Sequence, residues 1–222
     1  QEALQKRDDA LIGKRPADII YSQAKEANNA SEIFDLYYEG YSFYPNDTRF
    51  KKGLSEASNN LLNLAIRYHN QNKYGDAQSR YEKLLSADGV PDDINRKAEI
   101  LNNFATSNNP IPTIHEYIHY AENIGTVSGI LDAYVDGYIL YDKDPRMEDG
   151  ILKSARNLLN WASNQHQNGN FATALDRYNK VLGLPVINKH LKIEAEIKKD
   201  YALKSEFIPM ADQLYEYASS QD

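Results

Sequence analysis

The sequence of 222 residues contains no cysteine. This absence excludes disulfide bonds, a thiol nucleophile and metal sites built on thiolates. Tryptophan is nearly absent as well, with one residue against seventeen tyrosines. Aromatic packing and any aromatic contact surface must therefore be built mainly from tyrosine, whose ring is apolar and whose hydroxyl is polar.

Positive charge and long apolar runs are also scarce. The chain has 25 Lys and Arg against 32 Asp and Glu, a formal net charge of −7. Nucleic-acid phosphates require clustered Lys and Arg, so we expect no nucleic-acid partner. No apolar run approaches the roughly 18–20 residues that span a bilayer, so we expect no membrane insertion. No targeting sequence is recognisable and the chain begins with Gln, so we expect an excised or processed segment. The sequence therefore leaves the cellular compartment undecided.

No stretch alternates apolar and polar residues as a half-buried strand would. Apolar residues instead recur with the period of a helix, and the sequence predicts an all-α chain. The expected helices of the first half cover residues 18–27, 31–44, 48–71, 74–87 and 91–105, and Ser31 is the expected N-cap of the second. Gly53 and Gly150 fall inside long helical stretches, and we favour a break there, which gives six helices per unit rather than five.

The helical pattern occurs twice. Ser31–Ala105 aligns with Ser128–Ala202 at a constant offset (128 − 31 = 97), and 25 of the 75 positions are identical, which indicates an internal duplication of 97 residues. We expect a first unit with an opening helix at 1–110, a second unit at 111–207 and the start of a third at 208–222. The third is expected because IPMADQLYEYA (208–218) is similar to IPTIHEYIHYA (111–121). The chain is thus predicted to be a piece of a longer repeat array.

Residues 60–87 are the most regular part of the repeat. Large residues alternate there with Ala65 and Ala77, which lets two antiparallel helices approach closely. The positions that follow the helical period are Leu61, Leu64, Ala65, Tyr68, Tyr74, Ala77, Tyr81 and Leu84. This pattern resembles the tetratricopeptide repeat (TPR), and its second copy is formed by Leu158, Trp161, Ala162, Ala174, Tyr178 and Val181. The resemblance implies an α-solenoid of antiparallel helix pairs that serves as a binding scaffold.

Polar residues recur on the first helix of each pair. Asn60 and Asn63 are three residues apart and share a helix face. In TPR proteins this helix lines the concave surface, where Asn or Arg holds a peptide backbone or carboxylate. The resemblance therefore implies groove candidates at Asn60, Asn63, Arg67, Asn157, Asn160 and Asn164. Helix-to-helix hydrogen bonding or plain solvation explains the same residues, and the sequence leaves both roles open.

Two histidine patterns offer other roles. His115, Glu116 and His119 match H-E-x-x-H, in which two histidines bind zinc and the glutamate activates water. No third ligand follows at the expected spacing, so we expect no metal, no cofactor and no enzyme activity. His69 and His166 stand at the same position in both copies, near the end of a predicted helix, where we expect them to cap the helix C-terminus.

The function predicted from these patterns is a non-catalytic scaffold that binds another protein or an extended peptide. A second, weaker resemblance is to TPR-like segments of exported Gram-positive cell-wall hydrolases, which implies an extracellular or cell-surface location, with the cytoplasm as the alternative. The alternative functions are a cell-wall glycan targeting module and a zinc metallopeptidase. The tyrosines at 37, 41, 134 and 138 discriminate between the first two, because burial favours a scaffold and an exposed row favours sugar contact.

Overall fold

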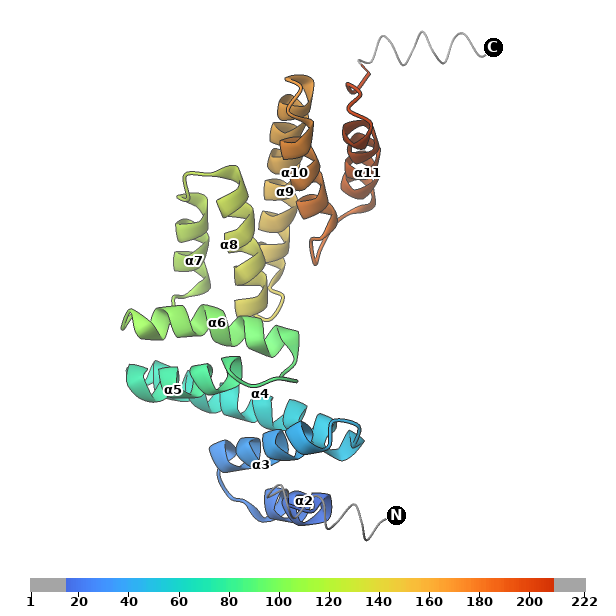
Figure 1. The fold of residues 1–222 in the computed structure, drawn as a ribbon. Coiled ribbons are helices and arrows are strands. Elements are labelled where there is room, and N and C mark those ends of the chain that lie inside the picture. The colour runs from blue at the N-terminus through green and yellow to red at the C-terminus, as the bar shows by residue number, and fades with distance from the viewer. Residues whose placement is uncertain (1–14, 210–222) are drawn as a thin grey trace, which may run out of the picture. The chain divides into compact units, whose positions relative to one another are not determined.

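The computed structural model describes residues 15–209, and every element of regular structure in this range is a helix (Figure 1). The prediction of an all-α chain is confirmed. The described residues form two compact units, which divide between Pro112 and Thr113. The helices of the first are α2 (Ala17–Glu26), α3 (Ala30–Phe43), α4 (Thr48–Asn70), α5 (Tyr74–Leu85) and α6 (Asp92–Thr106). Those of the second are α7 (Ile114–Glu122), α8 (Val127–Leu140), α9 (Pro145–Gln167), α10 (Phe171–Leu182) and α11 (Lys189–Leu203).

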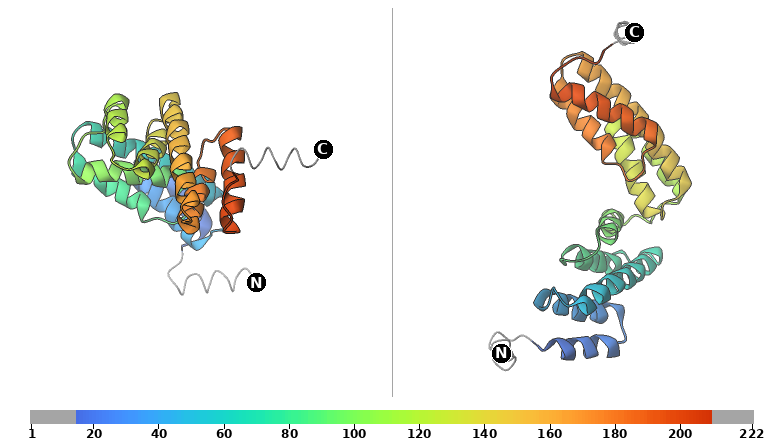
Figure 2. Two further views of the ribbon diagram at one scale, coloured as in Figure 1. Left: turned by 90° about the horizontal axis from the view of Figure 1, so that it is seen from above. Right: turned by 90° about the vertical axis from the view of Figure 1, so that its right-hand side faces the viewer.

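Within each unit, every helix packs against the next one along the chain, and α4 also contacts α6 as α9 contacts α11. Figure 2 shows these consecutive helices side by side in both units. This is the packing of an α-solenoid, in which a continuous core forms between neighbouring helices. The bounds of α8 to α11 follow those of α3 to α6 at the same offset of 97 residues.

Within residues 15–209 each unit has five helices, and neither long helix is broken at its glycine, so the expectation of six is wrong. Gly53 lies in the second turn of the unbroken helix α4, and Gly150 lies at the same place in α9. A Cβ atom on Gly53 would be 2.1 Å from the ring of Tyr37, and one on Gly150 would be 2.1 Å from the ring of Tyr134. These glycines let a tyrosine of the preceding helix lie directly on the helix backbone. They mark a close helix contact and not a helix end.

Short polar side chains set the helix starts. Asn29, and not Ser31, is the N-cap of α3, since its side chain accepts a hydrogen bond from the Glu32 N–H. Asp47 and Asp144 cap α4 and α9 and also bind Arg49 and Arg146 of the same first turns. An acidic cap satisfies free N–H groups at the helix start and favours helix initiation there.

The turn after the longest helix of each unit depends on one left-handed residue. Asn72 has φ of 59° and Gly169, its counterpart, has φ of 79°. The N–H groups of Asn72 and Lys73 donate to the carbonyls of His69 and Tyr68, which satisfies the end of α4. Asn and Gly tolerate this conformation best, so the chain reverses at once into the next helix.

A buried histidine then ties three segments of each unit together. His69 is 1% exposed, and its Nδ1 lies 3.3 Å from the Tyr81 hydroxyl of α5 while its Nε2 lies 2.9 Å from the Asn109 carbonyl oxygen, just after α6. His166 makes the equivalent contacts with Tyr178 and the Glu206 carbonyl, at 3.1 and 2.8 Å. The expected role as a helix cap is therefore corrected, because the imidazole bonds to other segments and not to its own helix end.

The expected start of a third unit at 208–222 lies almost entirely outside the described residues.

Candidate functional site

The six groove candidates all lie on solvent-exposed positions of the two longest helices. Asn60, Asn63 and Arg67 are exposed on α4, and Asn157, Asn160 and Asn164 are exposed on α9. The opposite faces of these helices are fully buried in the core of their own unit. Each candidate set therefore forms a polar stripe on the outside of a well-packed helix, which we call the α4 stripe and the α9 stripe.

The α4 stripe borders a small basic pocket. Arg67 lines a recess of about 240 Å³ together with Leu64, Tyr68, Gln71 and Lys73. The Tyr68 ring forms its aromatic wall, with Arg80 of α5 4.3 Å and Lys73 5.5 Å from the ring centroid. Cations over an aromatic face are attracted by its π electrons. The recess thus combines an aromatic surface with a positive charge, in a chain that is acidic overall.

The α9 stripe borders a different pocket. Here the recess is about 350 Å³ and is lined by Gly125, Thr126, Val127, Ser128, Leu158, Trp161 and Arg177. Trp161, which fills a place of the TPR pattern in the sequence, is 36% exposed. The Arg177 guanidinium carbon lies 6.0 Å from the Trp161 ring centroid. An exposed tryptophan beside an arginine is a composition typical of binding surfaces.

The two units keep one arginine but place its aromatic partner differently. Arg80 and Arg177 are equivalent in the duplication, yet Arg80 lies over Tyr68 and Arg177 lies over Trp161. The position equivalent to Trp161 is Leu64, and the position equivalent to Tyr68 is Gln165. The aromatic residue has therefore moved by one helical turn while the core around it is retained. Sequence reasoning missed this pair, although the mismatch between the two copies at these positions is a visible signal.

The H-E-x-x-H segment forms the start of α7. Glu116 accepts hydrogen bonds from the backbone N–H and the hydroxyl of Thr113, at 2.7 and 2.9 Å, and completes a capping box. These bonds lower the pKa of Glu116, whereas a general base works best with a pKa near the working pH. His115 and His119 are exposed. Among residues 15–209, no three His, Asp or Glu side chains are grouped so as to hold a metal ion.

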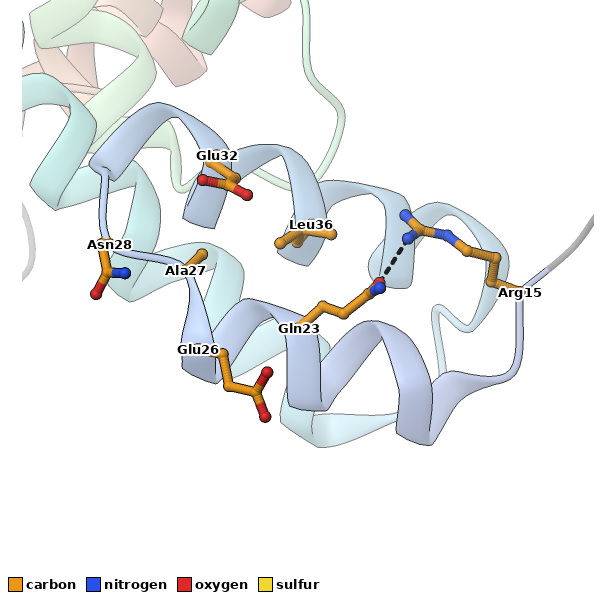
Figure 3. Close-up of a pocket in the computed structure, with 7 residues that line it drawn as sticks. All are labelled: Arg15, Gln23, Glu26, Ala27, Asn28, Glu32 and Leu36. Carbon is orange, nitrogen blue, oxygen red and sulfur yellow. Dashed lines mark hydrogen bonds between the residues drawn. The ribbon is translucent and has the colours of Figure 1, made fainter.

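A third pocket lies between α2 and α3. Figure 3 shows its lining residues, with Arg15 pointing toward Gln23. Arg15 donates to Gln23 at 2.5 Å and forms an ion pair with Glu39, which raises the pKa of the guanidinium. The Arg15 carbonyl also accepts a hydrogen bond from the Tyr44 hydroxyl. Its cation is fully used in joining α2 to α3, so this pocket is best explained as structural.

The tyrosines that discriminate between scaffold and glycan contact are not exposed. Tyr37 and Tyr134 are buried, and Tyr41 and Tyr138 are half-buried. The rings of Tyr37 and Tyr134 pack on Gly53 of α4 and Gly150 of α9, and the ring of Tyr41 packs on Gly89 of the turn after α5. They offer no aromatic row for stacking on sugars.

No protein-family model matches this chain, and no curated protein or solved structure matches it. The helical repeat architecture therefore rests on the residues and the structure themselves. Within the described part of the chain, no helix has both the length and the apolar character that a bilayer crossing requires.

Proposed function

We propose that this chain is a non-catalytic scaffold module that binds another protein through an extended peptide segment, and that it works within a larger exported or cell-surface protein. The observation that carries the binding role is the placement of the six groove candidates. They form two exposed stripes on helices whose other faces are fully buried, and each stripe borders a pocket with an aromatic and a basic side chain. Rigid helices that present such groups are well suited to peptide recognition.

The chemistry of the stripes supports a peptide as the ligand. An asparagine amide both donates and accepts hydrogen bonds, so it can pair with the N–H and the carbonyl of an extended backbone. Arg67 adds a charge that can bind a carboxylate. Tyr, Trp and Arg beside these groups are the residue types that contribute most binding energy at interfaces. The exported setting rests on the sequence resemblance alone.

Selection of random heptapeptides displayed on phage, with the full chain as bait, tests this function. We expect selected peptides to bind the chain in solution. Either of two double variants should weaken this binding about tenfold or more: Asn63→Asp with Arg67→Glu, or Asn160→Asp with Asn164→Asp. Asn103→Asp on the exposed side of α6 is the matched control and should change nothing. Co-sedimentation with purified peptidoglycan tests the alternative function, cell-wall glycan targeting. Retention on peptidoglycan with no selectable peptide would refute the peptide scaffold in favour of glycan targeting.

A further inference from the structure

The lining of the recess beside Trp161 says more about its ligand, because Arg177 is the one charged residue among the described residues that line it. Three of its walls are Val127 at the start of α8, and Leu158 and Trp161 on successive turns of α9. Its volume of about 350 Å³ lies within the range of roughly 300–1,000 Å³ that is usual for ligand pockets. Leu158 is buried, while Trp161 is still 36% exposed, so the apolar wall formed by Trp161 remains in contact with solvent.

The cations near this recess already have partners. Arg177 lies 3.1 Å from the Asp176 carboxylate. Lys180 donates to the Ser128 hydroxyl at 2.6 Å and lies 2.7 Å from the Asp132 carboxylate, which braces α10 against α8. A charged ligand group would lose its hydration without gaining an unpaired partner here. The pairing therefore favours a neutral occupant, in contrast to the basic pocket on α4.

The asparagines on either side of Trp161 limit the shape of the ligand. Asn157 is one turn before Trp161 and Asn164 is one turn after it, so all three share a face of α9. Seven residues of helix span about 10 Å, which is the length of about three residues of extended chain. A short extended segment can thus reach both amides while its middle side chain faces the tryptophan.

We propose that the Trp161 recess binds one large apolar side chain, aliphatic or aromatic, of an extended peptide in a partner protein, while Asn157 and Asn164 hold the flanking backbone. This inference rests on the proposed scaffold function and names the part of the partner that unit two recognises. Unit one, with Leu64 at the equivalent position and Tyr68 one turn later, recognises a different feature. The duplication has then produced two recognition sites of different chemistry on one type of helix pair.

The single tryptophan makes the test direct, because intrinsic tryptophan fluorescence reports this recess alone. Peptides selected as above, and free of tryptophan, are titrated into the full chain. We expect them to share an apolar residue and to shift the Trp161 emission to shorter wavelength. Replacing that residue with Ala should weaken binding about tenfold or more. Raising the salt from about 50 to 500 mM should change the affinity less than threefold, because no unpaired charge is involved.

Variants separate this inference from the scaffold function. Trp161→Leu installs the residue that unit one has at this position, so the fold is retained, and binding followed by the anisotropy of a labelled peptide should be lost. Tyr120→Leu, at an exposed aromatic position of α7 outside both stripes and both pockets, is the matched control and should bind normally. Three results would overturn the Trp161 inference while the scaffold function stands. The selected peptides could bind wild type and Trp161→Leu equally, they could share only acidic residues, or they could leave the emission of Trp161 unchanged. Failure of every peptide to bind any variant or the wild type would refute both.

A concentration-dependent emission shift without peptide would identify a second copy of the chain as the occupant and would also overturn the proposal. Analytical ultracentrifugation over the same concentrations gives that answer independently.

Discussion

His69 and Tyr81 form a buried pair that is repeated 97 residues later by His166 and Tyr178. The Nδ1–hydroxyl distance is 3.3 Å in the first pair and 3.1 Å in the second, and all four side chains are at most 1% exposed. In both units the second imidazole nitrogen contacts a backbone carbonyl, that of Asn109 after α6 or that of Glu206 after α11. The pair therefore fastens the end of each unit to its central helix hairpin.

Removing the Tyr81 hydroxyl should destabilise unit one. Tyr81→Phe leaves His69 Nδ1 buried without its partner, and we expect the free energy of unfolding to fall by about 1–3 kcal/mol. Urea denaturation followed by circular dichroism measures this change. Tyr74→Phe is the control, since the Tyr74 hydroxyl bonds to the exposed Asn72. Equal midpoints for Tyr81→Phe and wild type would show that the pair contributes nothing to stability.

A methyl group at Gly53 should be harmful although alanine favours helices. Gly53→Ala would place its Cβ 2.1 Å from the buried Tyr37 ring, and overpacking of this kind costs about 1–3 kcal/mol. The gain in helix propensity is at most about 1 kcal/mol, so the clash should win. Gly75→Ala is the matched control, because its Cβ has open space and the second unit has Ala172 there. In thermal unfolding, the melting temperature should fall for Gly53→Ala, and it should rise or stay unchanged for Gly75→Ala.

The small residue at the centre of each helix hairpin should resist enlargement. Ala77 and Ala174 are fully buried, and Ala77→Leu or Ala174→Leu should cost about 1–3 kcal/mol through overpacking. Ala172→Leu, at an exposed position of α10, should leave the melting midpoint within the error of the measurement. If both buried variants melt like wild type, the packing assigned to these hairpins is wrong.

Stability should decline at alkaline pH because tyrosines are buried as neutral phenols. Burial raises the pKa of Tyr141 to about 12 and also raises the pKa values of Tyr81, Tyr134 and Tyr178. A tyrosine whose pKa is raised in the native state contributes its full stabilisation at pH values below its unfolded pKa of about 10. This stabilisation is lost as the pH rises through the native pKa. Chemical denaturation at pH values from about 8 to 12 should show constant stability up to about pH 10 and a steady loss above it. Tyr141→Phe should reduce the slope between pH 10 and 12. If the slope of stability against pH is the same in Tyr141→Phe and wild type, Tyr141 does not contribute to the alkaline loss of stability.

The H-E-x-x-H segment should act as a helix start and not as a zinc site. After chelation and re-addition of zinc, elemental analysis should find no retained metal, and casein should survive incubation with the chain. Thr113→Ala should remove the capping box and lower the free energy of unfolding by about 0.5–2 kcal/mol, whereas Glu116→Gln keeps a side chain that the box accepts and should cost less. One tightly held zinc per chain, with loss of peptidase activity in Glu116→Gln, would refute this interpretation.

Periodicity in the sequence was sufficient to predict helices and several of their ends. The expected stretch 48–71 corresponds to α4 at Thr48–Asn70, and 91–105 corresponds to α6 at Asp92–Thr106. These features depend on contacts within a few residues, on helix caps and on the spacing of apolar residues. For the same reason the polar stripes could be predicted, since Asn60, Asn63 and Arg67 need only a helical period to share a face.

The tertiary structure alone decided which partner each residue meets. By sequence rules Gly53 signals a break, but the Tyr37 ring of the preceding helix makes a glycine necessary there. His69 stands at a helix end, but its bonds reach a hydroxyl 12 residues away and a carbonyl 40 residues away. Trp161 fits an apolar position of the repeat, yet it forms the wall of an open recess with residues of α8 and α10. Helical period determines the face on which a side chain lies, whereas the element that covers that face depends on how helices distant in sequence pack.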